Sequence, residues 1–446
     1  MKHALQVVIL AAGHGTRLKS DLPKVLHSLG GRPMVHYALD LACQMKPIET
    51  VLVVSPSLQD IQIPFPHKTV VQHPAQGTGD AVKYALPFLK ADGHVLILYG
   101  DTPLIQKATL EKILSFVERS PETSVTALGM RPPDKQNYAR LLLNEKGNLE
   151  EIIEDKDASP SQKEISLCNS GVMLVRGDFL REALAILTPQ NAAKEYYLTD
   201  LVKIARQKGN FCQVVEGEAS EFIGVNSRQD LAFAEACLQN RWREKAMREG
   251  VTLLDPQSTY LSYDTQLAQD VTLHPHVVLG PGVKIEKGAE ILSFCRLSGT
   301  HVGGNVVVGP FAHLRDGVYL QEGVEIGNFV EVKKSTFGPK AKAKHLSYIG
   351  DTEVGAKANI GAGTITCNYD GHKKHKTKIG EGVFIGSNCS LIAPLSIGEY
   401  AIVAAGSVVT EDVKERALAI GRALQTTVEK GADRLREKIL KKKEAL

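Results

Sequence analysis

The sequence predicts two domains of different architecture: a doubly wound, Rossmann-like α/β domain, followed by a parallel β-helix of hexapeptide repeats. Two observations predict this. Before about residue 250, short apolar runs alternate with helical patterns, as in α/β folds. After that point, apolar or small residues recur at every sixth position, a period that neither a strand nor an α-helix explains. We expect the domains to cover residues 1–226 and 250–446, with a helical linker over residues 227–249.

In the first domain, the apolar runs predict buried parallel strands over residues 5–9, 51–54 and 95–99, and the pattern predicts a helix over residues 79–90. Ligands of such sheets bind beyond the carboxyl ends of the strands. The residues expected at those ends are Gly13, Gly77-Thr78 and Gly100-Asp101.

In the second domain, one inward side chain in every six would fill a triangular prism. The repeat occurs in four registers: Val271, Val277, Val283, Ala289 and Cys295; Val318, Val324 and Val330; Tyr348, Val354 and Ile360; and Ile379, Ile385, Leu391, Ile397, Val403 and Val409. The period breaks between Ile360 and Ile379. We expect this insertion to leave the prism as a loop, and such loops often carry function.

Composition limits the function classes. A formal net charge of +3 is too small to indicate a nucleic-acid partner, and no apolar run is long enough to span a bilayer. We see no signal peptide, and the seven cysteines form no Cys-x-x-Cys pair, so we expect a cytoplasmic protein with reduced thiols and no structural zinc. The basic tail from Thr427 to Leu446 is expected to be a solvated helix.

Residues 10–24 form the most informative segment. Gly13 and Gly15 follow an apolar run, and Arg17 and Lys24 place two cations beside the glycines. Exposed backbone N–H groups with two cations suit a polyphosphate. A Gly-x-Gly pair alone would more often indicate an ordinary strand–turn–helix connection. The segment lacks the Gly-Lys-Ser/Thr ending of NTPase phosphate loops.

These motifs resemble known families. Residues 10–24 resemble the signature loop of sugar-nucleotide pyrophosphorylases, and the repeat resembles the left-handed parallel β-helix of hexapeptide acyltransferases, which commonly act as trimers. With Gly-Ala-Gly-Thr-Ile-Thr-Cys-Asn-Tyr-Asp-Gly at residues 361–371, nearly the whole chain resembles the bacterial N-acetylglucosamine-1-phosphate uridyltransferase/glucosamine-1-phosphate N-acetyltransferase family. The resemblance implies a nucleotidyltransferase domain and an acetyltransferase domain. It implies cytoplasmic homotrimers that use Mg²⁺, UTP and acetyl-coenzyme A to make UDP-N-acetylglucosamine, a precursor of peptidoglycan and lipopolysaccharide.

For the first domain, the resemblance implies that Asp101 and Asn226 are the magnesium ligands; by itself, Asp101 could equally be a turn or helix-cap residue. It assigns nucleotide and sugar binding to Leu10, Ala11, Ala12, Gly13, Arg17, Lys24, Gln72, Gly77, Thr78, Tyr99, Gly100, Asp101, Ala139, Glu154, Asn169 and Asn226. Within this set, Gln72, Gly77 and Thr78 resemble the uracil-binding segment. Glu154 and Asn169 match positions that hold the N-acetylglucosamine group, and Glu195 and Tyr196 match the segment that lines the same pocket in the family.

Three residues depart from the family pattern. Ala139 stands where the family usually has Gly, Lys194 stands where it often has Gly, and Asp80 stands where His is common. At Ala139, a backbone contact to the sugar tolerates a methyl group unless the position requires a positive φ, which favours glycine.

For the second domain, the resemblance implies that His345 is the general base that the amine acceptor requires; most histidines of the chain are expected to be ordinary surface residues. It assigns substrate binding to Arg315, Lys333, Tyr348, Asn359, Asn368 and Tyr369, and acetyl-coenzyme A binding to Ser387, Ala405 and Arg422. Leu424 replaces a proline that is frequent in the family, so the tail could follow a different path.

Two other functions remain open at this point. One is a single-activity nucleotidyltransferase whose β-helix only oligomerises or regulates. The other is a non-catalytic β-helical scaffold. The first would not be expected to carry His345 with Asn368-Tyr369, and the second gives no reason for Arg17, Lys24, Asp101 and Asn226 to occur together.

Overall fold

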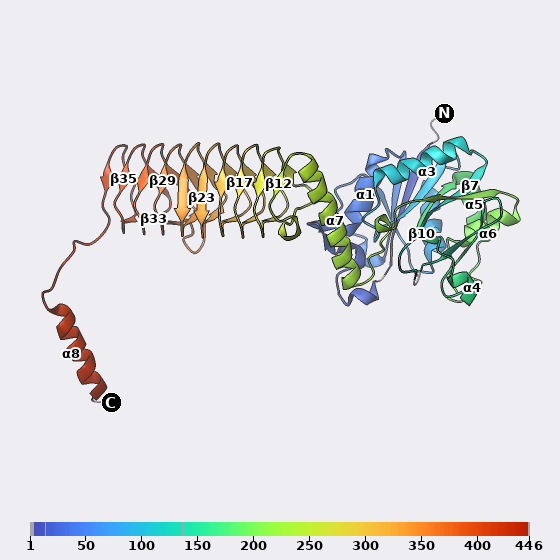
Figure 1. Ribbon diagram of the computed structural model, residues 1–446, viewed down its shortest axis with the longest axis horizontal. Helices are drawn as coiled ribbons and strands as arrows, with labels where there is room; N and C mark the ends of the chain where they lie inside the picture. The colour runs from blue at the N-terminus through green and yellow to red at the C-terminus, as the bar shows by residue number, and fades with distance from the viewer. Residues whose placement is uncertain (1–3, 14, 136–137, 445–446) are drawn as a thin grey trace. The chain divides into compact units, whose positions relative to one another are not determined.

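The computed structural model describes residues 4–13, 15–135 and 138–444. The chain forms two compact units, Met1–Trp242 and Arg243–Leu446 (Figure 1). Among the described residues, no helix is long and apolar enough to cross a membrane. His14 of the signature segment and residues 445–446 of the predicted tail lie outside the described residues.

The first unit is built on a mixed sheet. The strands of this sheet are β1 (Leu5–Ala11), β4 (Glu49–Val54), β5 (Lys68–Val71), β6 (His94–Tyr99), β7 (Thr123–Met130), β8 (Arg140–Leu143), β9 (Leu149–Ile153), β10 (Cys168–Arg176) and β11 (Phe211–Glu216). Strands β2 (Ser28–Leu29) and β3 (Arg32–Pro33) form a separate two-stranded sheet. The main sheet has the order β11-β7-β10-β6-β1-β4-β5. The predicted parallel strands are confirmed, because β1 pairs in parallel with both β4 and β6. The antiparallel β10, between β6 and β7, was not predicted.

Helices cover both faces of this sheet. They are α1 (Met34–Gln44), α2 (Thr78–Ala85), α3 (Lys107–Arg119), α4 (Pro160–Lys163), α5 (Gly177–Ile186) and α6 (Asp200–Gln207). One apolar core joins a sheet face to α2, α5 and α6, and another joins the opposite face to α1 and α3. This is the predicted doubly wound arrangement. The predicted helix over residues 79–90 is α2 followed by the 3-10 turn Leu86–Phe88.

Helix α7 (Arg228–Arg248) begins in the first unit, and the division between the two units falls near its C-terminal end, between Trp242 and Arg243. Its first part belongs to the first unit. Ala234 and Leu238 are buried in a core with Leu29, Met34 and Leu104, so this part of the predicted linker is packed.

The second unit is a parallel β-helix, whose short strands stack coil upon coil (Figure 1). Sheet 1 contains β12 (Thr252–Leu253), β14 (Thr272–Leu273), β17 (Glu290–Ile291), β20 (Val307–Val308), β23 (Glu325–Asn328), β26 (Lys342–His345), β29 (Asn359–Ile360), β32 (Phe384–Ile385), β35 (Ile402–Val403) and β37 (Leu418–Ala419). Sheet 2 contains β13 (Gln266–Leu267), β16 (Lys284–Ile285), β19 (Thr300–Val302), β22 (Val318–Leu320), β25 (Thr336–Phe337), β28 (Thr352–Val354), β31 (Thr377–Ile379) and β34 (Leu395–Ile397). Sheet 3 contains β15 (Val278–Leu279), β18 (Arg296–Leu297), β21 (His313–Leu314), β24 (Glu331–Lys333), β27 (Tyr348–Gly350), β30 (Ile365–Cys367), β33 (Ser390–Ile392) and β36 (Val408–Val409).

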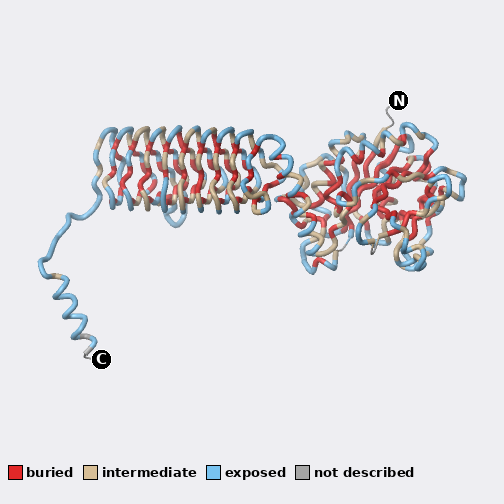
Figure 2. Tube along the Cα trace, in the orientation of Figure 1, coloured by how far each residue is buried: buried red, intermediate tan, exposed pale blue. Residues whose placement is uncertain are grey.

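The six-residue repeat fills the interior of this coil, as Figure 2 shows by the buried residues along its length. Almost every residue of the four predicted registers is buried. Tyr348 is the exception: it is only partly buried, and its neighbours Ser347 and Ile349 are buried instead. The prediction that Tyr348 points inward is therefore wrong. Side chains alternate along a strand, so the buried neighbours leave Tyr348 on the outer surface.

The break in the repeat forms a loop between β30 and β31, as predicted. Residues 369–374 are exposed, and Tyr369 bridges back to Lys374. At the C-terminus, residues 422–430 are exposed and helix α8 (Gly431–Glu444) follows. The predicted helical tail is thus confirmed within the described residues.

Candidate functional site

A pocket of about 620 Å³ opens at the carboxyl ends of the parallel strands of the first unit. Most of the predicted nucleotide residues line it: Leu10, Ala11, Ala12, Gly13, Lys24, Gln72, Gly77, Thr78, Tyr99 and Asp101, with Glu195. They come from the ends of β1 and β6, from the 3-10 turn Lys24–Leu26, from the segment before α2 with the first residue of that helix, and from the segment before α6. The sheet thus gathers residues that lie far apart in the sequence.

Two oxygen-bearing side chains of this site converge on one cation. The Lys24 ammonium donates to Oδ1 of Asn226 at 2.7 Å and forms an ion pair with Oδ2 of Asp101. Asn226 is placed by the first turn of α7, where Asp230 accepts from the backbone N–H groups of Asn226 and Ser227 at 3.0 and 2.8 Å. An oxygen pair that already holds a cation suits a hard divalent ion, whose other ligands would be phosphate and water. Among the described residues, no group of three His, Cys, Asp or Glu side chains could hold a metal alone.

The glycines of the signature segment differ in what a side chain would meet. A Cβ at Gly13 would find no atom within 4 Å, and Gly13 is exposed in the pocket. A Cβ at Gly15, where φ is +65°, would lie 2.5 Å from Cβ of Lys24. Gly13 thus leaves room for a ligand, whereas Gly15 allows the chain to pass close to Lys24.

The predicted uracil segment is held by the chain before α6. Tyr196 N–H donates to the carbonyl of Gln76, and Gly79 N–H donates to the carbonyl of Tyr196, both at 2.8 Å. A Cβ at Gly77, where φ is +110°, would lie 2.7 Å from the carbonyl oxygen of Tyr196. Only glycine fits there, which explains the glycine of the Gln-x-x-x-x-Gly-Thr segment in physical terms.

The predicted sugar residues extend the site beyond the pocket lining. Glu154 accepts from the hydroxyl of Thr199 at 2.9 Å, and burial raises the pKa of its carboxyl. The charge of Glu154 also acts on Tyr99 in the pocket, where burial chiefly raises the phenol pKa. Asn169 is buried, and its backbone N–H donates to the carbonyl of Ala139 at 2.8 Å.

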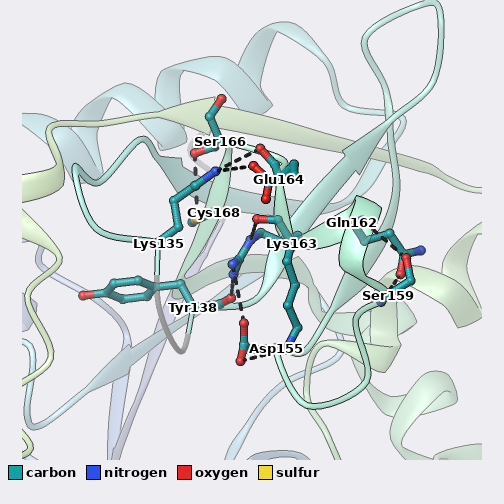
Figure 3. Close-up of polar contacts among 10 residues, drawn as sticks. Lys135, Tyr138, Asp155, Ser159, Gln162, Lys163, Glu164, Ser166 and Cys168 are labelled. Carbon is teal, nitrogen blue, oxygen red and sulfur yellow. Dashed lines mark hydrogen bonds and ion pairs between the residues drawn. The ribbon is translucent and has the colours of Figure 1, made fainter.

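Two departures from the family pattern concern this side of the site. Ala139 has no positive φ, so its methyl group is tolerated, and polar contacts fix the flanking chain (Figure 3). There, Lys135 donates to the carbonyl of Glu164, and the guanidinium of Arg140 donates to the carbonyls of Tyr138 and Lys163. Lys194 has φ of +55°, a conformation that favours glycine.

Besides Asn226 and the sugar residues, three more predicted residues of this unit are not part of the pocket lining. Arg17 is exposed, Gly100 lies behind Ala11 and Val25, and Tyr196 contributes through its backbone while its ring carries the Lys83 ammonium at 4.0 Å from the centroid.

In the second unit, His345 lies at the end of β26, directly opposite Asn328 of β23. Nδ1 of His345 is 2.7 Å from Oδ1 of Asn328. Because that oxygen can only accept, Nδ1 carries the proton of the neutral ring, and Nε2 keeps its lone pair. His345 is exposed, so Nε2 is available to a substrate.

The predicted base and the predicted acetyl-coenzyme A residues share one corner of the coil, between sheets 1 and 3. Backbone hydrogen bonds connect successive coils there: Leu346 N–H to Asn328, Gly363 N–H to His345, Asn388 N–H to Ala362 and Gly406 N–H to Ser387. The guanidinium of Arg422 donates to the carbonyl of Ala405 at the end of this line. The structure therefore gathers His345, Ser387, Ala405 and Arg422 along one edge.

The predicted phosphate residues lie on the adjoining sheet 3. Arg315 donates to Glu331 at 2.8 Å, and Lys333 ends the same strand as Glu331. The neighbouring Lys374, followed by Arg315, lowers the pKa of Lys333. This accumulation of positive charge suits a dianion.

The remaining predicted substrate residues lie around this cluster. Tyr348 pairs with Glu331 in the strand register, and Asn368 is buried with its amide donating to Asp351 at 2.5 Å. Tyr369 is exposed in the loop, whereas Asn359 pairs with Lys342, three residues before His345. The structure does not bring Asn359 opposite His345.

Comparisons with known proteins agree with this division. Residues 7–145 match the MobA-like NTP transferase domain, and residues 299–334 and 376–411 match the bacterial transferase hexapeptide family of six repeats. The "Bifunctional protein GlmU" of Paramagnetospirillum magneticum is 49% identical over 98% of both chains. The protein of the same name from Sphingopyxis alaskensis is 46% identical over 100% of this chain and 99% of its own. The inositol-1-phosphate CTP transferase from T. maritima aligns over 52% of this chain and 94% of its own, at 17% identity and with a TM-score of 0.42.

The chain belongs to the GlmU family. The family that the motifs indicated, the two-part fold and the bifunctional enzyme class are thereby confirmed.

In this GlmU family member, sequence reasoning missed residues that act through others. Asp230 places Asn226, Asn328 orients His345, and Lys374 adds a cation beside Lys333. Asp230 could have been found, because Ser227-x-x-Asp230 has the spacing of a helix capping box. Asn328 and Lys374 had no local signal, since their partners lie one or more coils away.

Proposed function

We propose that the two reactions of the GlmU family take place at the two separate sites described above. The chain acetylates glucosamine-1-phosphate with acetyl-coenzyme A and then joins the product to the uridylyl group of UTP, releasing pyrophosphate. The convergence of Asp101 and Asn226 on the Lys24 ammonium inside a strand-end pocket carries this proposal.

For uridylyl transfer, a phosphate oxygen of the sugar phosphate attacks the α-phosphorus of UTP, and the bond to the β-phosphate oxygen breaks. The nucleophile is already an anion, so the site needs alignment and charge neutralisation more than a base. Asp101 and Asn226 would hold Mg²⁺, which supplies charge neutralisation at the phosphates. Lys24 and the open backbone at Gly13 contact the phosphates, Gln72 recognises the base, and Glu154 and Asn169 hold the sugar.

For acetyl transfer, the amine of glucosamine-1-phosphate must be neutral to attack the thioester. Nε2 of His345 accepts its proton, the C–S bond breaks, and coenzyme A leaves as the thiol after taking up a proton. Arg315, Lys333 and Lys374 hold the sugar phosphate, while Ser387, Ala405 and Arg422 lie where the cofactor passes.

We further propose a homotrimer acting in the cytoplasm. Its support is the hexapeptide coil itself, together with an exposed line of stacked rings, Phe294, Phe311 and Phe329, with centroids 4.9 and 5.1 Å apart. Sedimentation equilibrium tests it: a monomeric mass at micromolar concentration would contradict the trimer.

One experiment tests both reactions. Pyrophosphate release from UTP and N-acetylglucosamine-1-phosphate is followed beside coenzyme A release from acetyl-coenzyme A and glucosamine-1-phosphate. We expect both, and we expect EDTA to abolish only the first. Absence of coenzyme A release would favour the single-activity nucleotidyltransferase, and absence of both would favour the scaffold.

A further inference from the structure

Asp80 is the third departure from the family pattern, and the structure gives it a partner. It lies in the first turn of α2, where its Oδ2 accepts from Nε2 of Gln72 at 2.7 Å. The same nitrogen donates to the carbonyl oxygen of Gly77 at 3.1 Å. Gln72 is only 4% exposed and lines the nucleotide pocket.

These two contacts fix which way the Gln72 amide faces. A carboxylate and a backbone carbonyl are acceptors only, so the amide atom that faces them must be the nitrogen. Both N–H bonds of that nitrogen are then used. The oxygen Oε1 is the part of the amide that remains for a ligand, and it can only accept.

An acceptor at this position distinguishes the two pyrimidine bases. Uracil carries an N–H at N3, which donates to an oxygen. Cytosine carries a lone pair at N3, which repels an oxygen, and an unpaired or opposed polar group in a closed site is costly.

We propose that Asp80 is a specificity-determining residue: by holding the amide nitrogen of Gln72, it makes Gln72 an acceptor and so selects UTP against CTP. This inference rests on the proposed function, in which Gln72 recognises the base. Without Asp80, only the carbonyl of Gly77 opposes rotation of the amide, and a rotated Gln72 would present its N–H groups to N3 of cytosine.

The test compares kcat/KM for UTP and for CTP in the full-length protein, with N-acetylglucosamine-1-phosphate and Mg²⁺. In Asp80→Ala, we expect the UTP/CTP ratio to fall about tenfold or more, the factor expected for losing a hydrogen bond to a charged acceptor. In Asp80→Asn, the new amide can still accept from Gln72 through Oδ1 but can also donate through Nδ2, so the ratio should lie between those of Asp80→Ala and the wild type. Asp178→Ala removes a first-turn carboxylate from α5, away from the pocket, and should leave the ratio unchanged.

The outcomes separate the inference from the proposed function. A wild-type ratio near one would overturn the assignment of Gln72 to the base, and the role of Asp80 with it. A high wild-type ratio that Asp80→Ala preserves would overturn the role of Asp80 alone. If Asp80→Ala lowers kcat/KM for UTP and for CTP by the same factor, the ratio is unchanged. That result would show that Asp80 has only a structural role and would also overturn the inference. If Asp80→Ala does not fold, Asp80→Ser provides the same comparison, because its hydroxyl can face Gln72 as donor or acceptor and no longer imposes one orientation.

Discussion

Lys194 shows how a single backbone angle limits stability. Its φ of +55° costs a non-glycine residue about 1–2 kcal/mol, and its side chain is exposed. Lys194→Gly removes this strain but adds freedom to the unfolded chain, so we expect a net gain of about 0.5–1 kcal/mol. The midpoint temperature of the unfolding transition of the first unit should rise by about 2 °C. Lys194→Ala keeps the strain and is the control: an equal rise there would contradict the explanation.

The Asp101→Ala variant tests whether Asp101 is a metal ligand. Asp101→Ala leaves Asn226 as the remaining oxygen ligand and leaves Lys24 without its ion pair. A metal clamp supplies several kcal/mol to phosphoryl transfer, so pyrophosphate release should fall by orders of magnitude while coenzyme A release is nearly unchanged. Equal loss of both activities in a folded variant would show that Asp101 is structural.

The His345→Ala variant tests whether His345 is the general base of acetyl transfer. General-base catalysis contributes about 10²–10⁴-fold, and we expect His345→Ala to lower the kcat of acetyl transfer by that factor without affecting uridylyl transfer. Near-normal acetylation with an unchanged acid limb of the pH–rate profile would show that another group takes the proton.

Asn328 tests how His345 is oriented. In Asn328→Asp, a carboxylate would face Nδ1 and stabilise the imidazolium relative to the neutral ring. Because the neutral ring is the base, the acid limb should move to higher pH. Asn328→Ala loses one hydrogen bond, so kcat should fall about 2–10-fold without a shift toward higher pH. If neither variant changes the profile, Asn328 does not act through His345.

At the scale of elements, the signature segment combines two kinds of glycine. Gly13→Ala adds a methyl group where a ligand would lie, so we expect a higher KM for UTP with unchanged thermal stability. Gly15→Ala meets Cβ of Lys24 at 2.5 Å in a left-handed conformation, so both stability and activity should fall. A loss of stability in Gly13→Ala would show that Gly13 serves the fold rather than the ligand.

The elements also show how far the sequence predicts the fold. Apolar runs and the six-residue period identify β1, β4, β6 and the interior of the coil, because burial along a strand or coil is a local pattern. The antiparallel β10 was missed since pairing direction depends on distant chain segments. Tyr348 was placed in the wrong register because the period shortens locally: Ala343 and Ile349 are buried six residues apart, but the next inward residue, Val354, follows after five. Site residues were predictable where a motif names them, whereas Asn328 and Lys374 depend on coil stacking.

At the scale of the molecule, the sequence predicts domain boundaries at residues 226 and 250. The structure indicates which fragments test the first boundary. The first part of α7 completes the first unit: Arg228 donates to the carbonyl of Leu18, Glu235 accepts from Gly30 N–H at 2.7 Å, and Trp242 lies against Gly30. A fragment of residues 1–226 would lose these contacts and expose the core around Leu29 and Met34.

We therefore expect a fragment of residues 1–248 to form UDP-N-acetylglucosamine from UTP and N-acetylglucosamine-1-phosphate at near the full-length rate. The fragment of residues 1–226 should be markedly less stable, since burial of each large apolar side chain contributes about 1.5–3 kcal/mol, and it would also lack the Asp230 carboxylate that places Asn226. Thermal unfolding and pyrophosphate release, measured on both fragments, show whether the first domain ends at residue 226 or extends through α7. Equal stability and activity of the two fragments would show that α7 is a linker from its first residue. Loss of uridylyl transfer in a folded 1–248 fragment would show instead that the first site requires the β-helix.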